Sequence, residues 1–403
     1  MHAHGRGLGV AFPTHASALP PAALERIRVR FRPAIAIATV LTVTMLSACT
    51  GVAEPTPSRT VLDLDVTGTV GITLPADEGS RYLEAGSAIE TLLTTWGATV
   101  DLRYSGPDPA DQADQITAMV DAGADLLIVT PVQADALAQP LAAAREAGVP
   151  VIAYDRLIRD TPDVDYYVGF DRFGIGVQVG WAALSGLGLG DLNGDPTGAL
   201  PDEPYPLEVF AGDLTAPDFY YGYNGTVRQV LELSAEQGST TFGSGQSAPD
   251  AVATTDARSA AARMTQLLQT VYTEGVSLRA VTTAGDDIAA AVIASLRDHG
   301  LSPGSDQWPV VVGVGATTEG LRAIESGEQY ATILTDDRLV HEAAAYLAAS
   351  VLLGEQLDSL NVKDYDNGAR TVPALLVPGT IVTADNLQAT IIDSGYASRS
   401  EIG

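Results

Sequence analysis

Apolar and polar positions alternate along most of the chain in two distinct patterns. Short runs of almost continuous apolar residues, such as the Leu-Leu-Ile-Val segment within 125–130, are typical of strands buried on both faces of a sheet. The longer segments between them mix apolar with polar residues at the period of an amphipathic helix. Strands are expected at 66–74, 100–104, 125–130, 149–154, 166–170, 207–211, 278–282, 310–313 and 330–334. Helices are expected at 84–96, 112–122, 134–147, 175–187, 221–236, 257–273, 287–299, 318–326 and 339–353.

This regular succession of strand and helix predicts an α/β fold. Strands that alternate with helices form βαβ units, in which the helices cover both faces of a parallel sheet. The number of strands exceeds what one sheet of ordinary width holds, so we expect two doubly wound lobes of parallel sheet. No sequence period of about 20 to 50 residues repeats, which excludes solenoids and propellers.

The first 48 residues have the pattern of an export signal. Arginines at positions 26, 28, 30 and 32 precede an apolar run at 33–48. This run is shorter than the roughly 20 apolar residues that span a bilayer, so a transmembrane anchor is the less favoured alternative. The Leu-Ser-Ala-Cys sequence that ends at Cys49 resembles the lipobox of bacterial lipoproteins, which implies cleavage before Cys49 and lipidation of its thiol. Residues 49–65 hold prolines and no apolar period, and are expected to form a flexible tether.

Composition excludes several classes of function. The 403 residues include 50 acidic and 22 basic side chains, for a formal net charge of −28, whereas nucleic-acid binding requires clustered Lys and Arg. The leader holds five of the basic residues, so the exported portion is more acidic still. A single cysteine excludes an internal disulfide and a Cys-rich metal site. Beyond the leader the histidines are His299 and His341, both expected at the surface, so we predict no metal, no cofactor and no catalytic triad.

The junctions between predicted strands and the helices that follow them carry most of the candidate chemistry. In open α/β sheets, ligands bind beyond the carboxyl ends of the strands. The junctions at 74–82, 130–133, 154–156, 170–172, 211–213, 283–286 and 313–315 are rich in Asp, Arg and aromatic residues. Carboxylate and guanidinium groups hydrogen-bond hydroxyls, and an aromatic face covers the apolar face of a sugar ring. A helix cap or a surface ion pair is the alternative for any single Asp among them.

Four sequence strings in the same region resemble a known family. They are Val-Ile-Ala-Tyr-Asp-Arg-Leu-Ile at 151–158, Tyr-Tyr-Val-Gly-Phe-Asp at 166–171, Gly-Glu-Gln-Tyr-Ala-Thr at 327–332 and Asp-Asn-Gly-Ala-Arg-Thr-Val-Pro at 366–373. With them, the chain from Gly71 to Tyr396 resembles the type I periplasmic sugar-binding proteins of ABC importers, in the xylose-binding and multiple-monosaccharide-binding branch.

The resemblance implies two lobes that are joined by three hinge strands and close on a sugar. We place the first lobe at 66–170 plus 316–354 and the second at 171–315 plus 355–403.

The resemblance also implies a set of site residues. Arg81 matches an Arg that hydrogen-bonds the sugar, and Tyr82 stands where the branch has a stacking aromatic residue. Asp155 and Arg156 match a central Asp-Arg pair, and Asp286 matches an Asp on the hinge side of the second lobe. Further expected ligand contacts are Gln133, Asp218 and Phe219.

Three departures from the family pattern remove polar groups. Where the family has Asp-Asn-Asn-Ala, residues 216–219 read Ala-Pro-Asp-Phe, so Pro217 replaces a polar residue. Gly315 stands where the family has a carboxylate, and Thr335 stands in place of a Lys. Because an unpaired polar group in a buried site costs about 1 to 3 kcal/mol, these changes predict an altered ligand, such as a less hydroxylated sugar, or a weaker affinity.

These observations predict a non-enzymatic, exported receptor, a monomer held on the outer face of the cytoplasmic membrane through lipid on Cys49. It would capture a monosaccharide-like solute between its lobes and deliver it to an ABC permease, with no nucleic-acid partner. One alternative is a receptor of the same fold that reports sugar to a signalling system. A second is a cell-surface glycosidase that uses carboxylates such as Asp155 and Asp286 as acid and base.

Overall fold

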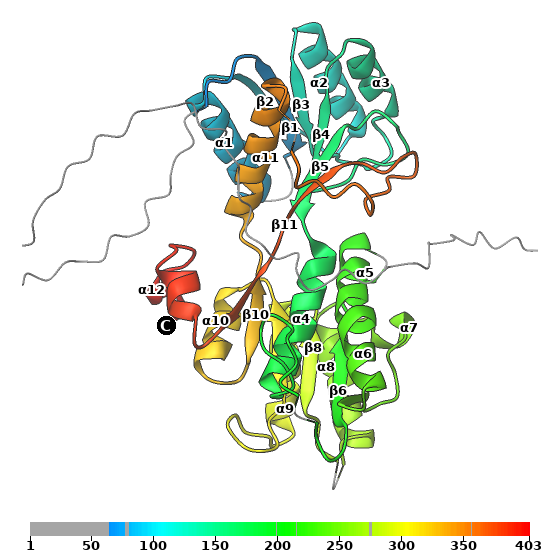
Figure 1. Cartoon of the computed structure of the whole chain (residues 1–403), viewed down its shortest axis with the longest axis vertical. Helices are drawn as coiled ribbons and strands as arrows, with labels where there is room; N and C mark the ends of the chain where they lie inside the picture. The colour runs from blue at the N-terminus through cyan, green and yellow to red at the C-terminus, as the bar shows by residue number, and fades with distance from the viewer. Residues whose placement is uncertain (1–63, 77–79, 199, 215, 274–275, 356) are drawn as a thin grey trace, which may run out of the picture. The chain divides into compact units, whose positions relative to one another are not determined.

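The computed structural model describes residues 64–403, apart from 77–79, 199, 215, 274–275 and 356 (Figure 1). The predicted export signal, Cys49 and the predicted tether up to residue 63 lie outside the described residues. In the part of the chain that is described, no helix is long and apolar enough to cross a membrane.

The first sheet of the described chain has six strands, all parallel, in the order β11-β5-β4-β3-β1-β2. The strands are β1 (Thr69–Pro75), β2 (Thr99–Ser105), β3 (Leu126–Val129), β4 (Val151–Tyr154), β5 (Tyr166–Phe170) and β11 (Ala374–Val377). Helices α1 (Ser80–Thr95) and α11 (Asp337–Leu352) pack together on one face, and α2 (Pro109–Asp121) and α3 (Ala138–Glu146) pack together on the other (Figure 1).

The second sheet also has six described strands, in the order β12-β10-β9-β8-β6-β7. These are β6 (Tyr205–Phe210), β7 (Thr240–Phe242), β8 (Ala280–Thr283), β9 (Val310–Val314), β10 (Ala331–Leu334) and β12 (Thr380–Thr383), which runs antiparallel to β10. On one face lie α4 (Arg172–Gly186), α5 (Pro217–Tyr223), the π-helix η1 (Asn224–Leu231) and α6 (Glu232–Glu236). On the other lie α8 (Ala257–Thr270) and α9 (Asp286–Asp298), with α10 (Thr318–Glu325) beside α9. The predicted fold of two doubly wound α/β lobes is confirmed.

Strand β3 shows why these runs are apolar throughout. Leu126 and Ile128 belong to the core between the first sheet and helices α1 and α11, whereas Leu127 and Val129 belong to the core under α2 and α3. Successive side chains of a strand point to opposite faces, so a strand covered on both sides needs apolar residues at every position.

The described chain crosses between the two sheets three times, between β5 and α4, between β10 and α11, and between β11 and β12. The predicted lobe boundaries are therefore wrong in two places. Residues 318–334 belong with the second sheet, because β10 pairs with β9, and residues 374–377 belong with the first, because β11 pairs with β5. The first error arose because we placed the second crossing directly after 310–313, one βαβ unit too early.

Several short elements were not predicted from the sequence. They are β7, β11, β12, α7 (Pro249–Val252), the π-helix η2 (Gln388–Ile392) and α12 (Arg399–Ile402). The single helix expected at 221–236 is three elements, α5, η1 and α6. Its π-helical part lies where α4 approaches most closely: a Cβ atom at Gly176 would clash with the carbonyl oxygen of Gly222, and one at Gly225 would clash with that of Phe173.

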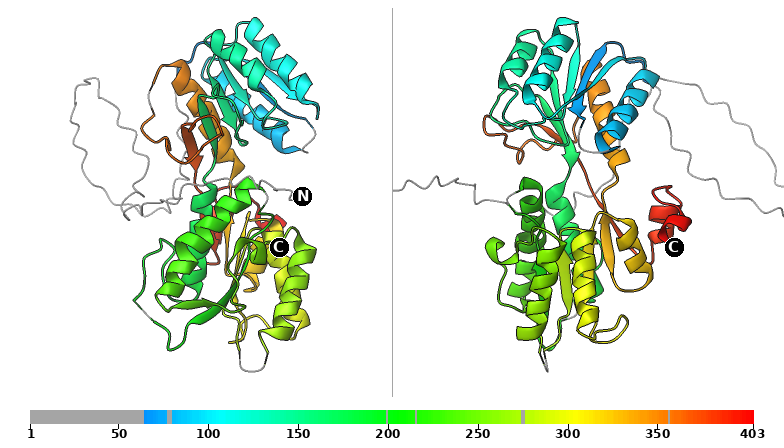
Figure 2. Two further views of the ribbon diagram at one scale, coloured as in Figure 1. Left: turned by 90° about the vertical axis from the view of Figure 1, so that its right-hand side faces the viewer. Right: turned by 180° about the vertical axis from the view of Figure 1, so that it is seen from behind.

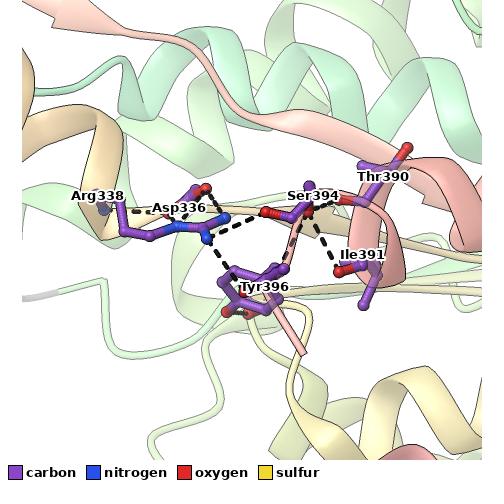
Figure 3. Close-up of polar contacts among 8 residues, drawn as sticks. Asp336, Arg338, Thr390, Ile391, Ser394 and Tyr396 are labelled. Carbon is purple, nitrogen blue, oxygen red and sulfur yellow. Dashed lines mark hydrogen bonds and ion pairs between the residues drawn. The ribbon is translucent and has the colours of Figure 1, made fainter. Parts of the chain in front are cut away.

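The C-terminal segment that follows β12 packs on the second sheet next to the crossing into α11 (Figure 2). Arg338, in the first turn of α11, binds the carboxylate of Asp336 and donates to the carbonyl oxygens of Ser394 and Gly395 at 3.3 and 3.2 Å (Figure 3). Its guanidinium carbon lies 5.7 Å from the ring centroid of Tyr396. One side chain thus connects a hinge crossing to the end of the chain.

Candidate functional site

Two residues of the first turn of α1 converge on Asp155, which directly follows β4. The Tyr82 hydroxyl donates to Oδ2 of Asp155 at 2.8 Å, and Nη2 of Arg81 lies 2.6 Å from Oδ1. The side chain of Asp155 is 8% exposed, whereas that of Arg81 is 44% exposed. The structure therefore brings together three of the predicted site residues at the carboxyl ends of β1 and β4, with a guanidinium group that solvent can reach.

Arg156 joins this cluster through the ring of Tyr82. The guanidinium carbons of Arg81 and Arg156 lie 5.1 and 5.7 Å from the Tyr82 ring centroid, within the range of a cation–π interaction. Tyr82 is only 1% exposed, so its ring does not offer the open stacking face that we expected at this position. In this conformation Tyr82 positions Asp155 and two arginines.

The backbone of Asp155 is held in an uncommon conformation. Its φ angle is +63°, in the left-handed region that non-glycine residues seldom adopt. Its N–H donates to the carbonyl of Val168 on β5 at 2.8 Å, and its own carbonyl accepts from the Tyr167 hydroxyl at 3.1 Å. These bonds stabilise a turn that aims the carboxylate toward α1. Such strained residues cluster at ligand-binding sites.

Charge and burial shift the pKa values of both partners of Asp155. Burial raises the pKa of Tyr82, and the negative charge of Asp155 raises it further, so the phenol keeps the proton that it donates. Burial by itself would lower the pKa of Arg81, but the negative charges of Asp155 and Asp337 together with the nearby phenols of Tyr82 and Tyr154 offset this, and the pKa is raised. Both groups therefore remain donors.

A second carboxylate near Arg81 was missed by the sequence analysis. Asp337 lies in the first turn of α11, directly after a hinge crossing. Burial raises its pKa, and the positive charges of Arg81 and Arg172 act in the opposite direction. The sequence contained the information needed to find Asp337, because this residue lies at the junction between a strand and a helix, as the other candidate residues do.

His341, one turn further along α11, was predicted to lie at the surface and is buried. Its ring centroid lies 6.4 Å from that of Tyr154, and α11 packs against α1 in the core of the first lobe. Burial lowers the pKa of His341, and the charge of Asp337 opposes the shift. The error came from reading polar neighbours in sequence as a solvent-exposed face.

Asp286 is buried, with 2% exposure, at the start of α9. Among the described residues it accepts four hydrogen bonds, from the Thr317 backbone and hydroxyl, Gln329 and Thr332, at 2.8, 3.2, 2.9 and 2.8 Å. A carboxylate has about four acceptor positions, so these donors leave little capacity for a ligand. Asp286 therefore ties the turn after β9 to β10 in this conformation, in place of the predicted contact with a sugar.

The remaining predicted residues are not part of the Arg81–Asp155 cluster. Gln133 is exposed in the loop after β3, and its amide donates to Asp135 at 2.9 Å. Asp218 belongs to α5, but its side chain lies outside what the structure describes. Phe219 is partly exposed and lines a cavity of about 220 Å³ in the second lobe, together with Arg172.

The described residues include no group of three or more His, Cys, Asp or Glu side chains placed to hold a metal ion. The glycosidase alternative named Asp155 and Asp286 as acid and base. Asp155 is bound by Arg81 and Tyr82, and Asp286 is buried, so neither is an exposed carboxylate in this conformation. The arrangement is suited to binding hydroxyl groups.

A family model described as "Periplasmic binding protein domain" matches residues 70–356. The chain belongs to this family. Its members bind solutes without catalysis, so the prediction that the protein is not an enzyme is confirmed and the glycosidase alternative is not retained.

Individual relatives agree with this membership. The multiple sugar-binding periplasmic protein SbpA of Azospirillum brasilense is 35% identical over 83% of this chain and 90% of its own length. The multiple sugar-binding periplasmic receptor ChvE of Rhizobium radiobacter is 31% identical over 83% and 92%. Among solved structures, a solute-binding protein of an ABC transporter from Clostridium phytofermentans with bound β-D-glucose is 29% identical, with a TM-score of 0.64. It covers 83% of this chain and is itself covered completely.

Proposed function

We propose that this protein is an extracytoplasmic receptor that captures a monosaccharide between its two lobes and delivers it to an ABC-type permease. The observation that carries the proposal is the convergence of Arg81 and Tyr82 on Asp155 at the carboxyl ends of two parallel strands. Open α/β sheets bind ligands at this edge. The names of the relatives support a sugar as the solute, because they describe multiple sugar-binding proteins and a protein with bound β-D-glucose.

The cluster can recognise hydroxyl groups in two ways. The partly exposed guanidinium of Arg81 can donate charge-assisted hydrogen bonds to sugar oxygens, and the carboxylate of Asp155 can accept from a sugar hydroxyl. Because Tyr82 and the β5 backbone already hold Asp155, little side-chain freedom is lost on binding. The three crossings between the sheets supply the hinge about which the lobes would close on the solute.

A thermal-shift screen over D-glucose, D-allose, D-xylose, D-ribose and xylitol tests the proposal. A sugar at about 100 times its Kd should add about 2.7 kcal/mol to the free energy of unfolding. Arg81→Ala should remove the shift. Arg103→Ala is the matched control, since Arg103 pairs with Asp101 on β2 at the same N···O distance of 2.6 Å. No shift with any of these ligands in the wild type would overturn the proposal.

We further propose that the receptor is held at the cell surface through lipid on Cys49. The support is the Leu-Ser-Ala-Cys sequence after a basic and apolar leader. Cys49→Ser should move the protein from the membrane fraction to the medium, or to the soluble extracytoplasmic fraction, without changing its affinity for sugar. An unchanged membrane fraction for Cys49→Ser would contradict the anchor and leave the sugar-binding proposal intact.

A further inference from the structure

A cavity of about 220 Å³ lies between one face of the second sheet and the helices α4, α5 and η1. Most of its lining side chains are apolar, among them Ile175, Val179, Val209 and Phe219. A cavity of about 150 Å³ with an apolar lining is large enough to bind benzene. This cavity therefore has room for an alkyl or aryl group. Asp286, the predicted polar sugar contact of the second lobe, does not line it.

The cavity opens at the edge of the sheet where solutes bind in this class of fold. Its lining includes the last residues of three strands, Phe210 of β6, Thr283 of β8 and Val314 of β9. It also includes Arg172, the first residue of α4 after the hinge crossing. Strand β5 of the first sheet ends at Phe170, two residues before Arg172, so the cavity lies beside the hinge crossing between β5 and α4.

One polar atom in the lining has no partner among the described residues. Oγ1 of Thr282 is buried without a hydrogen bond, and Thr282 as a whole is 1% exposed. The neighbouring Thr283 hydroxyl differs, because it donates to the carbonyl oxygens of Gly285 and Val312 at 2.9 and 3.0 Å. Buried hydroxyl groups are normally paired, so Thr282 is available to bond a group that enters the cavity.

The helices around the cavity cannot move together to fill it. At Gly176 of α4 and Gly225 of η1 the backbones are already so close that a Cβ atom would clash with a backbone carbonyl oxygen of the facing helix, that of Gly222 and that of Phe173 respectively. The Thr226 hydroxyl donates to the carbonyl of Gly176 at 2.8 Å and fixes this contact. Because the helices touch through their backbones at this crossing, the space beside it persists.

We propose that this cavity is an apolar subsite that receives an alkyl, aryl or deoxy-methyl substituent of a monosaccharide, with the Thr282 hydroxyl as a polar contact. The inference rests on the proposed function and narrows it: the solute is a sugar derivative that carries an apolar group. The sugar ring itself is held by the Arg81–Asp155 cluster.

Calorimetric titration with matched sugars tests the subsite. The probes are D-glucose, 6-deoxy-D-glucose, and the methyl, phenyl and 2-hydroxyethyl β-D-glucosides. At least one substituted sugar should bind about tenfold or more tightly than D-glucose, since an added apolar group in a matching pocket gives a factor of about ten or more. Val179→Phe, which fills the cavity from α4, should abolish this gain and leave the Kd for D-glucose within about threefold. Ala284→Leu at the mouth is a second filling variant, for use if Val179→Phe does not fold.

Thr282→Val tests the polar contact with little change of shape. The affinity for the 2-hydroxyethyl glucoside should fall about tenfold, while that for the phenyl glucoside changes by less than about threefold. Thr240→Val is the matched control, because Oγ1 of Thr240 is also buried without a described partner but Thr240 does not line the cavity. It should change neither affinity.

The outcomes separate the subsite from the proposed function. If D-glucose binds and every substituted sugar binds equally or more weakly, the subsite is overturned and the sugar receptor stands. If the substituted sugars gain affinity equally in Val179→Phe or Ala284→Leu, the cavity is not where the substituent lies. If no sugar in either screen binds, the proposed function itself fails.

Discussion

The guanidinium of Arg81 lies 2.6 Å from Oδ1 of Asp155, although the two residues follow different strands, β1 and β4. The strands are not neighbours, since β3 lies between them, but parallel strands bring their carboxyl ends to one edge. Tyr82 donates to the other carboxylate oxygen, so one turn of α1 fixes the orientation of Asp155. The side chains of Arg81 and Asp155 are therefore already oriented in the absence of a solute.

Tyr82→Phe should weaken sugar binding about tenfold. The substitution leaves Oδ2 of Asp155 without its 2.8 Å donor, and a hydrogen bond to a charged group contributes about 1.5 to 3 kcal/mol. Titration of the best sugar from the thermal-shift screen measures the effect. Tyr104→Phe is the control, because the Tyr104 hydroxyl bonds the carbonyl of Leu83 in the same helix at 3.3 Å. Equal affinities for both variants would show that Tyr82 does not position the site.

Arg263→Met should lower the free energy of unfolding by about 3 to 5 kcal/mol. Glu208 is fully buried on β6 and lies 2.9 Å from Arg263, so the variant leaves a buried charge without its counter-ion. Hydrogen bonds from Ser244 and Tyr272 remain but carry no positive charge. Urea denaturation measures the loss.

Arg228→Met supplies the comparison for this ion pair. Arg228 and Glu232 are separated by one turn of helix and are accessible to solvent, so the expected loss is only about 0.3 to 0.5 kcal/mol. A loss of similar size for both variants would mean that burial does not strengthen the ion pair between Arg263 and Glu208.

Stability should decline on acidification through His341. Its pKa is lowered in the folded protein by burial, so below an ordinary pKa of about 6.5 the unfolded chain binds the proton first. The resulting loss of unfolding free energy is absent above that pH. It grows as the pH falls toward the pKa of the folded protein, by at most about 1.4 kcal/mol per pH unit. Denaturation of the wild type and His341→Gln at pH 7.5 and 5.5 should therefore show a smaller decline for the variant. If the unfolding free energies of the wild type and His341→Gln fall by the same amount, groups other than His341 cause the loss of stability at acidic pH.

Arg338→Ala should loosen the C-terminal segment without unfolding the lobes. Arg338 donates to the carbonyl oxygens of Ser394 and Gly395 and lies over the ring of Tyr396 (Figure 3). Amide hydrogen exchange in residues 388–402 should accelerate about tenfold, because local opening depends on the few contacts that hold a segment. Arg370→Ala is the control, since Arg370 is exposed and bonds the neighbouring carbonyl of Thr371. Unchanged exchange in Arg338→Ala would show that other contacts hold the segment, namely its apolar packing and the hydrogen bonds from Arg322 to the carbonyl oxygens of Glu401 and Ile402.

Most strands and helices could be read from the sequence, because a strand covered on both faces must be apolar at every position. The helix expected at 221–236 was one exception. Its division into α5, η1 and α6 depends on the backbone of α4 reaching Gly222 and Gly225, and sequence periodicity does not report what a helix touches. The strands β11 and β12 were missed because each has four residues and lies in a turn-rich tail.

The sequence by itself determined the fold class and pointed to the junctions at 74–82 and 154–156, because the carboxyl ends of parallel strands lie at one edge of a sheet. The resemblance to sugar-binding proteins then singled out Arg81, Tyr82 and Asp155 within them. Only the tertiary structure decided the lobe membership of 318–334 and 374–377, the enclosure of Asp286 and the burial of His341. It also decided the cavity at Thr282. These features depend on which strands pair and how closely helices approach, and both are set by contacts between residues far apart in the chain.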